Sequence, residues 1–229
     1  MKQFVGLFIC MIAMLTVVGQ GKDRPVQPDV PGDISIDFGF NLLMGDKGDL
    51  ETNFWHSKSV SLYYMYTHKL SDLFTVNPQL GFSIEKIGFG NEMNYVQNSD
   101  RTFTFDSIQG VTVNSSKLAM NYVELPIEFR YYPLKTIDGE GFFIGVGPII
   151  GAKIESYTKV RYETRSESPK TDKQQGVFGL SDVRYGLVGR FGFKGVNAFA
   201  KYYISDIWRN GPNGASPNLF TVGINFTGF

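Results

Sequence analysis

The residues of this sequence that are best suited to chemistry are few: two histidines, His56 and His68, and one cysteine, Cys10. His56 stands in "NFWHSKS", with Ser57 and Ser59 close by in sequence. A serine, a histidine and an acid held within hydrogen-bond reach would form the nucleophilic constellation of a hydrolase. Closeness in sequence does not make such a triad, and two histidines without a carboxylate cluster do not make a metal site. We therefore predict no catalytic residues, no metal site and no enzymatic activity.

The glycine-rich stretch "GVGPIIG", residues 145–151, resembles a phosphate-binding loop only in its glycine content. A phosphate loop needs a helix after it, and here the pattern continues as a strand. We expect its glycines to lie on the inner face of that strand, where they leave room for bulky side chains from facing strands. No cofactor is predicted.

The charge of the chain argues against nucleic acid as a partner, because 22 Lys and Arg balance 22 Asp and Glu. Charged residues make up only 19% of the sequence, against about 25% in an ordinary soluble domain. Glycine, with 26 residues, and the aromatic residues, at 15%, are abundant. A chain with so few charges suits a low-dielectric surrounding.

The N-terminus predicts export. Residues 1–19 read as a cleaved signal peptide, with Lys2 before an apolar stretch that is too short to span a membrane. Residues 20–32, rich in proline, read as a periplasmic linker, and residues 33–229 as one domain. Cys10 lies in the signal peptide, so the mature chain has no thiol, as suits an extracytoplasmic compartment.

The domain alternates apolar and polar residues with period two, which predicts an all-β fold. Eight stretches carry this pattern: 34–43, 60–67, 73–86, 122–132, 141–155, 181–192, 196–205 and 219–229. The connections between them alternate long and short, as in an up-and-down antiparallel barrel with four hairpins. The phase of 196–205 stays open, because Phe199 and Tyr203 lie opposite Val196, Ala198, Tyr202 and Ile204.

Two kinds of barrel fit this pattern. A soluble barrel would place the apolar residues inside and cover the outside with Lys and Glu, but the polar face here is dominated by Gly, Ser, Thr and Asn. An outer-membrane barrel places the apolar face against lipid and the small polar residues inside, with short periplasmic turns and long external loops. We therefore predict an eight-stranded transmembrane barrel.

The stretch "YVELPIEFRYY", residues 122–132, together with the Gly81 strand, the Gly145-Val-Gly147-Pro148 strand and the terminal Phe229, resembles the small outer-membrane β-barrel, or porin family, proteins of Bacteroidetes. The resemblance covers most of the chain from Asp33. It implies a location in the cell outer membrane, periplasmic termini, and passage through the barrel-assembly machinery during biogenesis. It implies little about the role of this particular chain.

A lumen of eight strands is narrow enough for side chains to fill. Eleven ionisable residues are predicted to point into it: Asp37, Glu85, Glu124, Glu128, Arg130, Lys153, Glu155, Asp182, Arg184, Arg190 and Lys201. Buried charges persist when they are paired, so we expect a self-neutralising network that plugs the barrel. The alternative is a path for protons or small ions, that is, a narrow channel.

The external loops are the predicted surface for partners. In "RTFTFDSIQGVTVNSS", Phe103 and Phe105, then Val111 and Val113, alternate with polar residues, which predicts strands that protrude above the membrane and offer an edge to a protein partner. The alternative is that these residues close the loop on itself. The basic residues around 159–173 have a slight excess over the acids, which suits either a plain solvated loop or contact with the phosphates of lipopolysaccharide.

These observations favour a non-enzymatic envelope barrel that presents external loops, in contact with outer-membrane lipid and lipopolysaccharide. The alternatives are a narrow channel, a component of a secretion or assembly machine, and a lipid-modifying enzyme acting through His56. In residues 122–133 we expect Val123, Leu125, Ile127 and Phe129 to face lipid, with Tyr131 and Tyr132 at the periplasmic interface. Pro126 removes a backbone donor, so we predict a bulge there or a lumen group that serves its orphaned partner.

Overall fold

The computed structural model describes residues 31–48, 50–90, 93–97, 103–107, 112–133, 141–164, 167–193, 195–209 and 211–228. One compact unit, Gly32–Phe229, carries the fold. The predicted signal peptide and nearly all of the predicted linker lie outside the described residues, as does Val111.

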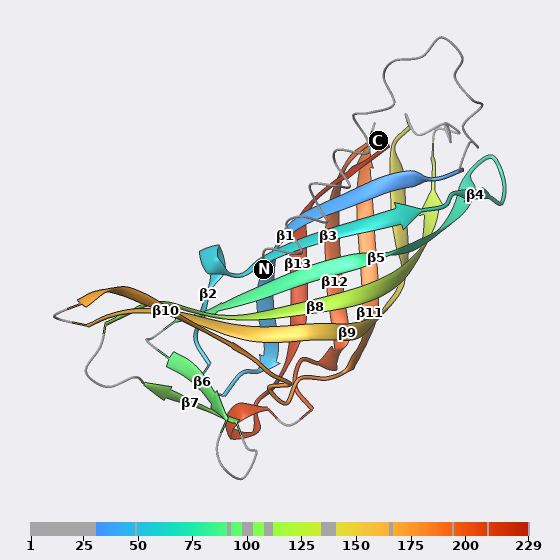
Figure 1. Ribbon diagram of the computed structural model, residues 1–229. Helices are drawn as coiled ribbons and strands as arrows, with labels where there is room; N and C mark the ends of the chain where they lie inside the picture. Colours follow the sequence, from blue (N-terminus) through green and yellow to red (C-terminus); the bar gives the residue numbers. More distant parts are fainter. Residues whose placement is uncertain are drawn as a thin grey trace. The chain divides into compact units, whose positions relative to one another are not determined.

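Within the described residues, eight long strands form a closed antiparallel barrel, as predicted (Figure 1). They are β1 (Asp33–Asp46), β3 (Lys58–Met65), β5 (Phe74–Phe89), β8 (Thr112–Tyr131), β9 (Phe143–Thr164), β11 (Val183–Phe193), β12 (Val196–Asp206) and β13 (Ser216–Thr227). Each pairs with the next in this order, and β13 pairs with β1 to close the barrel.

The remaining described elements are short or lie at one end. They are β2 (Thr52–Asn53), η2 (Phe54–His56), β4 (His68–Lys69), β6 (Met93–Gln97), β7 (Phe103–Ser107), β10 (Glu167–Gln175) and η3 (Pro212–Gly214). β10 extends the sheet from β9, whereas β6 and β7 form a separate two-stranded sheet. A search of the described residues for helices that could cross a membrane finds none.

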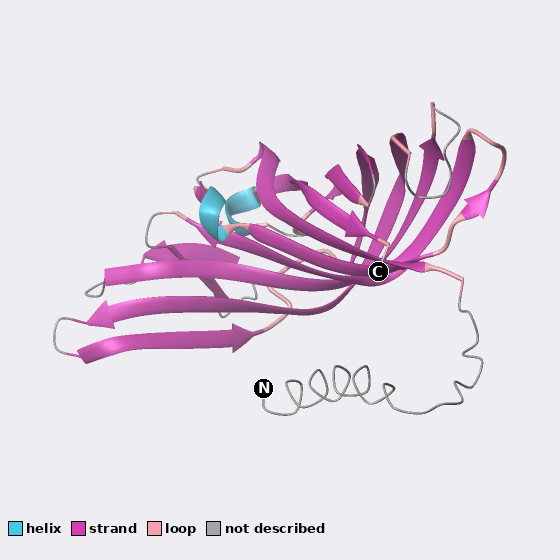
Figure 2. Cartoon of the chain, turned by 90° about the horizontal axis from the view of Figure 1, so that it is seen from above, coloured by secondary structure: helices cyan, strands magenta, loops and turns pink. Residues whose placement is uncertain are grey.

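The two ends of the barrel differ in the length of their connections. At one end β11 and β12 are joined by residues 194–195, and β4 lies in the β3–β5 connection; we call this the short-turn end. At the other end, the long-loop end, β8, β9 and β10 run on past the rest of the barrel (Figures 1 and 2). A strand such as β9, with 22 residues, is about twice as long as a bilayer needs.

The outer surface of the barrel is apolar over a broad belt. Large side chains from every strand are exposed there, with Phe82 60% and Ile144 55% accessible. The apolar belt is formed by Phe38, Val60, Leu62, Tyr64, Leu80, Phe82, Ile84, Leu125, Phe129, Ile144, Val146, Ile150, Leu187, Phe191, Val196, Tyr202, Ile204 and Ile224. A water-soluble monomer rarely exposes a contiguous apolar patch of more than a few hundred Å², so this surface calls for an apolar solvent.

Inside the belt, the alternation of a strand places polar side chains in the lumen. Small polar residues are fully buried there, including Ser35, Ser61, Thr75, Ser83 and Asn225. On β12 the buried set is Asn197, Phe199, Lys201 and Tyr203. The inward face of residues 196–205, which the sequence left open, is therefore the face that carries Lys201.

Toward the long-loop end the interior changes character and becomes an apolar core. Inward residues of β5 and β8, such as Ile87 and Leu118, pack there with residues from the long connections, such as Phe178 and Trp208. The full cluster is Leu43, Leu50, Ile87, Phe89, Leu118, Met120, Tyr122, Ile149, Phe178, Leu180, Tyr203, Ile207, Trp208, Ala215 and Leu219. We call it the apolar cap.

Pro126 lies in a strand of regular register, so the predicted bulge at this position is wrong. Between β5 and β8, Pro78 pairs with Ile127 and Gly81 pairs with Glu124, and these two pairs have the same register. The two positions between them, Pro126 and Leu125, have no paired residue in β5. The sheet accommodates the absent donor by leaving this part of the β5–β8 ladder unpaired. Leu125 and Phe129 face outward as expected.

Tyr132 does not face outward beside Tyr131. Its side chain is only 4% exposed, and its ring lies 5.7 Å from that of Phe143 inside the short-turn end. Neighbouring residues of an extended chain point to opposite faces. Of these two tyrosines, only Tyr131, which is 40% exposed, lies on the outer surface of the barrel.

Candidate functional site: the buried charge network

The lumen holds a network of ionised side chains that balance one another. Among the described residues, the fully buried charged groups are four acids and four bases: Asp37, Glu85, Glu124, Glu128, Arg130, Arg184, Arg190 and Lys201. We call these eight the charge network. All eight belong to the eleven residues that the sequence directs into the lumen.

Arg184 connects two carboxylates at the side of the network nearest the apolar cap. Its Nη2 lies 2.7 Å from Glu124 Oε1 and 3.2 Å from Glu85 Oε1. The guanidinium lies between two aromatic rings, 3.8 Å from the centre of Tyr122 and 4.0 Å from that of Tyr203. A planar cation that contacts two carboxylates and two aromatic rings has little freedom to move.

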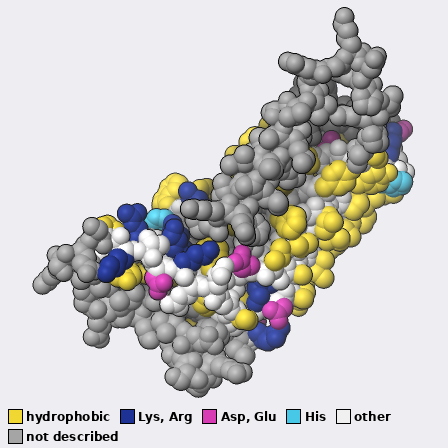
Figure 3. All heavy atoms as spheres, viewed as in Figure 1, with side chains coloured by type: hydrophobic (Ala, Val, Ile, Leu, Met, Phe, Trp, Pro, Cys, Tyr) yellow, Lys and Arg dark blue, Asp and Glu magenta, His cyan; other side chains and the backbone are white. Residues whose placement is uncertain are grey.

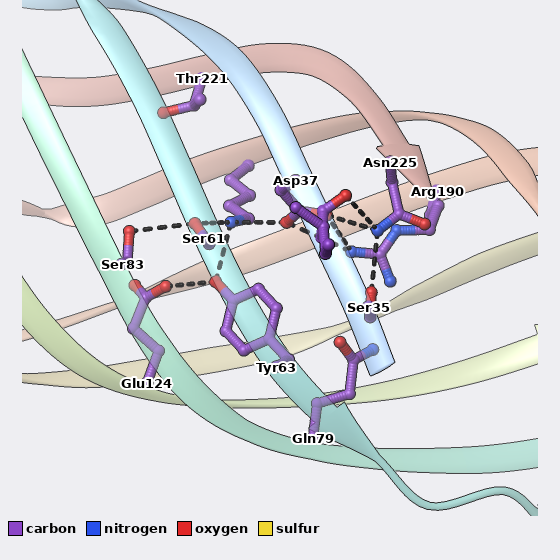
Figure 4. A network of polar contacts seen from close by, with 12 residues as sticks. Ser35, Asp37, Ser61, Tyr63, Gln79, Ser83, Glu124, Arg190, Thr221 and Asn225 are labelled. Atoms are coloured by element: carbon purple, nitrogen blue, oxygen red, sulfur yellow. Dashed lines mark hydrogen bonds and ion pairs between the residues drawn. The ribbon is translucent and has the colours of Figure 1, made fainter. Parts of the chain in front are cut away.

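Lys201 occupies the middle of the network. Its Nζ lies 2.8 Å from Asp37 Oδ2 and donates to Tyr63 Oη at 2.9 Å and Ser61 Oγ at 3.1 Å. Tyr63 in turn donates to Glu124 Oε2 at 2.5 Å. The Tyr63 hydroxyl therefore joins Lys201 to Glu124; Figure 4 shows the bond between Tyr63 and Glu124.

Arg190 and Arg130 complete the network toward the short-turn end. Arg190 pairs with Glu128 through Nη1 and with Asp37 through Nη2, the latter at 3.1 Å. Glu128 also accepts from Arg130 Nε at 3.0 Å and from Gln79 Nε2 at 2.8 Å. Arg130 lies over the ring of Phe143, 4.3 Å from its centre.

The contacts form one continuous series in which acids and bases alternate. It runs from Glu85 through Arg184, Glu124, Tyr63, Lys201, Asp37, Arg190 and Glu128 to Arg130. Each carboxylate contacts at least one cation, and further polar groups satisfy its remaining lone pairs; Asn225, for example, donates to Asp37 Oδ1 at 2.7 Å. Such pairing is the condition under which charges persist in a low-dielectric interior.

Glycines of β9 make room for these side chains, as the sequence predicts. A methyl group built on Gly145 would lie 3.1 Å from Arg130 Cγ, and one on Gly151 would lie 3.2 Å from Glu124 Cγ. Any larger residue at either position would compete with the charge network for the same space.

Three of the eleven predicted lumen residues lie outside the network. Lys153, Glu155 and Asp182 are near the long-loop end. Lys153 donates to Leu180 O at 3.0 Å and pairs with Asp182 at 3.1 Å. The hydrogen bond and charge of Lys153 hold the pKa of the exposed Asp182 below its usual range, with a further contribution from Arg209.

Glu155 faces outward because β9 contains a bulge. Asn121 pairs with Glu155 while the next residue, Tyr122, pairs with Lys153, so β9 has one residue more than β8 at this point. An extra residue shifts the inward and outward faces of the strand beyond it. Glu155 is exposed and bonded to Asn121 and Gln175.

Three tyrosines belong to the site although they are missing from the predicted set. Tyr63 and Tyr203 donate to Glu124, and Tyr122 covers Arg184. The strand phase already turns Tyr63 and Tyr122 inward, whereas the sequence leaves open the phase of the strand that carries Tyr203; a list restricted to charged residues omits all three. Aromatic residues on a lumen face, close to predicted cations, are the signal that would have found them.

His56 does not form a triad with the serines beside it. Ser57 is buried and donates its hydroxyl to Asn53 O at 2.8 Å, while Gly88 N donates to Ser57 Oγ at 3.0 Å. His68 lies in β4, at the opposite end of the barrel. Within the described residues there is no group of three or more His, Cys, Asp or Glu that could hold a metal ion.

The residues predicted to offer a partner edge lie in different strands. Phe103 and Phe105 belong to β7, whose backbone pairs with β6, so this part of the loop does pair with itself. Val113 belongs to the protruding part of β8 and pairs with Tyr162. The protruding edge in the described residues is formed by β10, which pairs with β9 on one side.

A family model described as "Outer membrane protein beta-barrel domain" matches residues 32–205 of the chain. Among curated proteins none is matched. Two crystal structures of Ail, the attachment invasion locus protein of Yersinia pestis, are similar at 12% identity, with TM-scores of 0.36 for the complex with the heparin analogue sucrose octasulfate and 0.37 for the other. Each comparison covers 86% of this chain and 99% of Ail.

Proposed function

This chain belongs to the outer membrane protein beta-barrel domain family, and from that premise we propose that it is a non-enzymatic barrel with a closed lumen. Its long connections would then provide the external surface that serves envelope structure or binds a partner. The observation that carries the proposal is the continuous charge network across the lumen, with the apolar cap beyond it. Both would have to be displaced before water could form a column through the barrel.

The charge network is better suited to holding the barrel together than to conducting ions. Each carboxylate of the network pairs with a cation from another strand, and Arg184 and Lys201 are held by at least two polar contacts each. Conduction requires sites that an ion can enter and leave. Nothing in these contacts supplies an exchangeable site.

Planar-bilayer recording tests the closed lumen. We expect the refolded wild-type barrel to give no channel events of porin size, while a general porin inserted under the same conditions does. Steady conductance in the wild-type protein would refute the closed lumen. Loss of that conductance in Asp37→Asn, a change that removes a network charge with little change in shape, would establish the narrow channel instead.

The protruding strands support the role in binding. β10 carries backbone groups on its outer side that, in the described part of the chain, no strand pairs. An edge of this kind can accept an extended segment of another protein. Co-purification of the full-length barrel with envelope proteins after mild crosslinking, and its loss when residues 167–175 are replaced by a short turn, is the expected result; unchanged co-purification would remove β10 from the proposal.

A further inference from the structure

A row of lysines crosses the outer face of the barrel beyond the apolar belt. It consists of Lys58 in β3, Lys86 in β5, Lys117 in β8, Lys159 in β9 and Lys173 in β10. Lys117 pairs directly with Lys159, and Lys159 pairs with Lys173. Figure 3 shows Lys and Arg side chains gathered on this face, past the end of the apolar surface. We call these five residues the lysine row.

The lysine row continues the lipid-facing side of the strands. On β3, Lys58 follows Val60 and Leu62 on the outward face, and on β5, Lys86 follows Ile84 and Phe82. On β8 and β9 the row lies farther out, because Asn121 and Glu155 come between the belt and the lysines. The row therefore starts at the edge of the apolar belt and extends away from it.

The lysines are packed side by side without acids to neutralise them. Within the described residues, none of the five forms an ion pair with a carboxylate. Burial lowers the pKa of Lys117, and the charges of Lys86, Lys159 and Lys58 lower it further. Like charges facing each other across a sheet destabilise it, so a bound polyanion would relieve a repulsion built into the fold.

Neighbouring residues add an aromatic and an apolar component to the row. Ala119 lies between Lys86 and Tyr157 in the cross-strand register and is only 2% exposed. Lys173 Nζ lies 3.9 Å from the centre of the Tyr157 ring. Tyrosine and long cationic side chains with apolar stems are typical of the boundary between acyl chains and water.

We infer that the lysine row binds the phosphate groups of a phosphorylated glycolipid in the outer leaflet, of the lipopolysaccharide type. Lys58 and Lys86 are placed to meet phosphates at the level of the acyl-chain boundary, and Lys117, Lys159 and Lys173 to meet phosphates carried farther out on sugars. The inference rests on the outer-membrane location of the chain and is independent of whether the lumen is closed.

Binding of lipid A to the purified barrel in detergent tests the inference, with native mass spectrometry as the readout. We expect bis-phosphorylated lipid A to bind at least about tenfold more tightly than dephosphorylated lipid A, and added salt to weaken binding. The variant Lys86→Gln, Lys117→Gln, Lys159→Gln should lose this preference. The control Lys47→Gln, Lys69→Gln, Lys170→Gln makes the same change in net charge outside the row and should keep it.

Several results would overturn the inference. One is equal binding of phosphorylated and dephosphorylated lipid A by the wild-type barrel. Another is an unchanged preference for phosphorylated lipid A in the row variant. A third is an equal loss of that preference in the control variant, which would show that net charge alone is responsible. Full displacement of the lipid by a soluble sulfated polysaccharide at matched charge would assign the row to a soluble polyanion. The β-sheet circular dichroism of each variant shows that it is folded, and a bilayer recording of the same sample separates this result from the test of the closed lumen.

Discussion

Arg190→Gln should lower the free energy of unfolding by about 3 to 5 kcal/mol, the usual cost of breaking a buried ion pair by removing one partner. Arg190 has no exposed surface in its side chain and contacts both Glu128 and Asp37. Without it, the charge network holds four carboxylates and three cations. Glutamine keeps much of the side-chain length, so the decrease in unfolding free energy is due mainly to the missing charge and less to a cavity.

The measurement is equilibrium unfolding of the barrel by urea in lipid vesicles, followed by tryptophan fluorescence. Arg209→Gln is the matched control, since Arg209 pairs with Asp182 where both side chains are more than half exposed; the expected change is at most about 1 kcal/mol. The double variant Arg190→Gln with Glu128→Gln restores the balance of charge and should recover part of the loss. Equal effects of Arg190→Gln and Arg209→Gln would show that the network contributes little to stability.

Gly147→Ala should prevent or strongly impair folding of the barrel. A methyl group on Gly147 would overlap the carbonyl oxygen of Ile127 and lie 3.0 Å from the Cα of Glu128. Backbone cannot move aside as the end of a side chain can, so β8 and β9 would have to separate at a point where Glu128 anchors the network. Overpacking alone costs about 1 to 3 kcal/mol, and the loss of network contacts adds to that.

Gly189→Ala provides a control in the neighbouring strand. Gly189 pairs with Val146, next to the Val188–Gly147 pair, and a methyl group there would have nothing within 4 Å. The readout is the folded fraction on unheated gels, together with the urea midpoint. Similar folded fractions for the two alanine variants would mean that the strands tolerate a wider spacing at Gly147.

The features that sequence could predict are those that depend on local alternation. Period two identifies all eight barrel strands, and the polar character of one face sends Glu124, Arg184 and Lys201 inward together. The alternation can be recognised within a single strand, because it depends only on residues that are close together in the sequence.

The features that sequence did not predict depend on how distant strands align. The extra residue of β9 reverses the face of Glu155, and nothing in "AKIESY" distinguishes that bulge from a regular strand. The charge series needs the register of six strands before its order is known, and the lysine row brings together positions 58, 86, 117, 159 and 173 in the same way. The bulge predicted at Pro126 is wrong because a barrel can instead leave a ladder position unpaired.

The polarity of β8 changes sign along its length. Near the short-turn end Leu125 is outside and Glu124 inside, whereas farther along Lys117 is outside and Leu118 inside. The first part of this strand therefore has the apolar exterior that lipid requires, and the second part has the polar exterior that water requires. The level at which the outward side chains change from apolar to charged marks the membrane surface on the protein itself. The part beyond that level resembles a small soluble domain, with the apolar cap as its core and lysines as its exterior.

This reversal fixes the barrel in the membrane in one direction. To slide back toward the short-turn side, the protein would have to drag the lysines of β5, β8 and β9 through hydrocarbon. The apolar cap would also have to enter the membrane, and it is broad because residues of three long connections are packed into it. Movement of the folded barrel toward the short-turn side is therefore opposed both by the lysines and by the apolar cap.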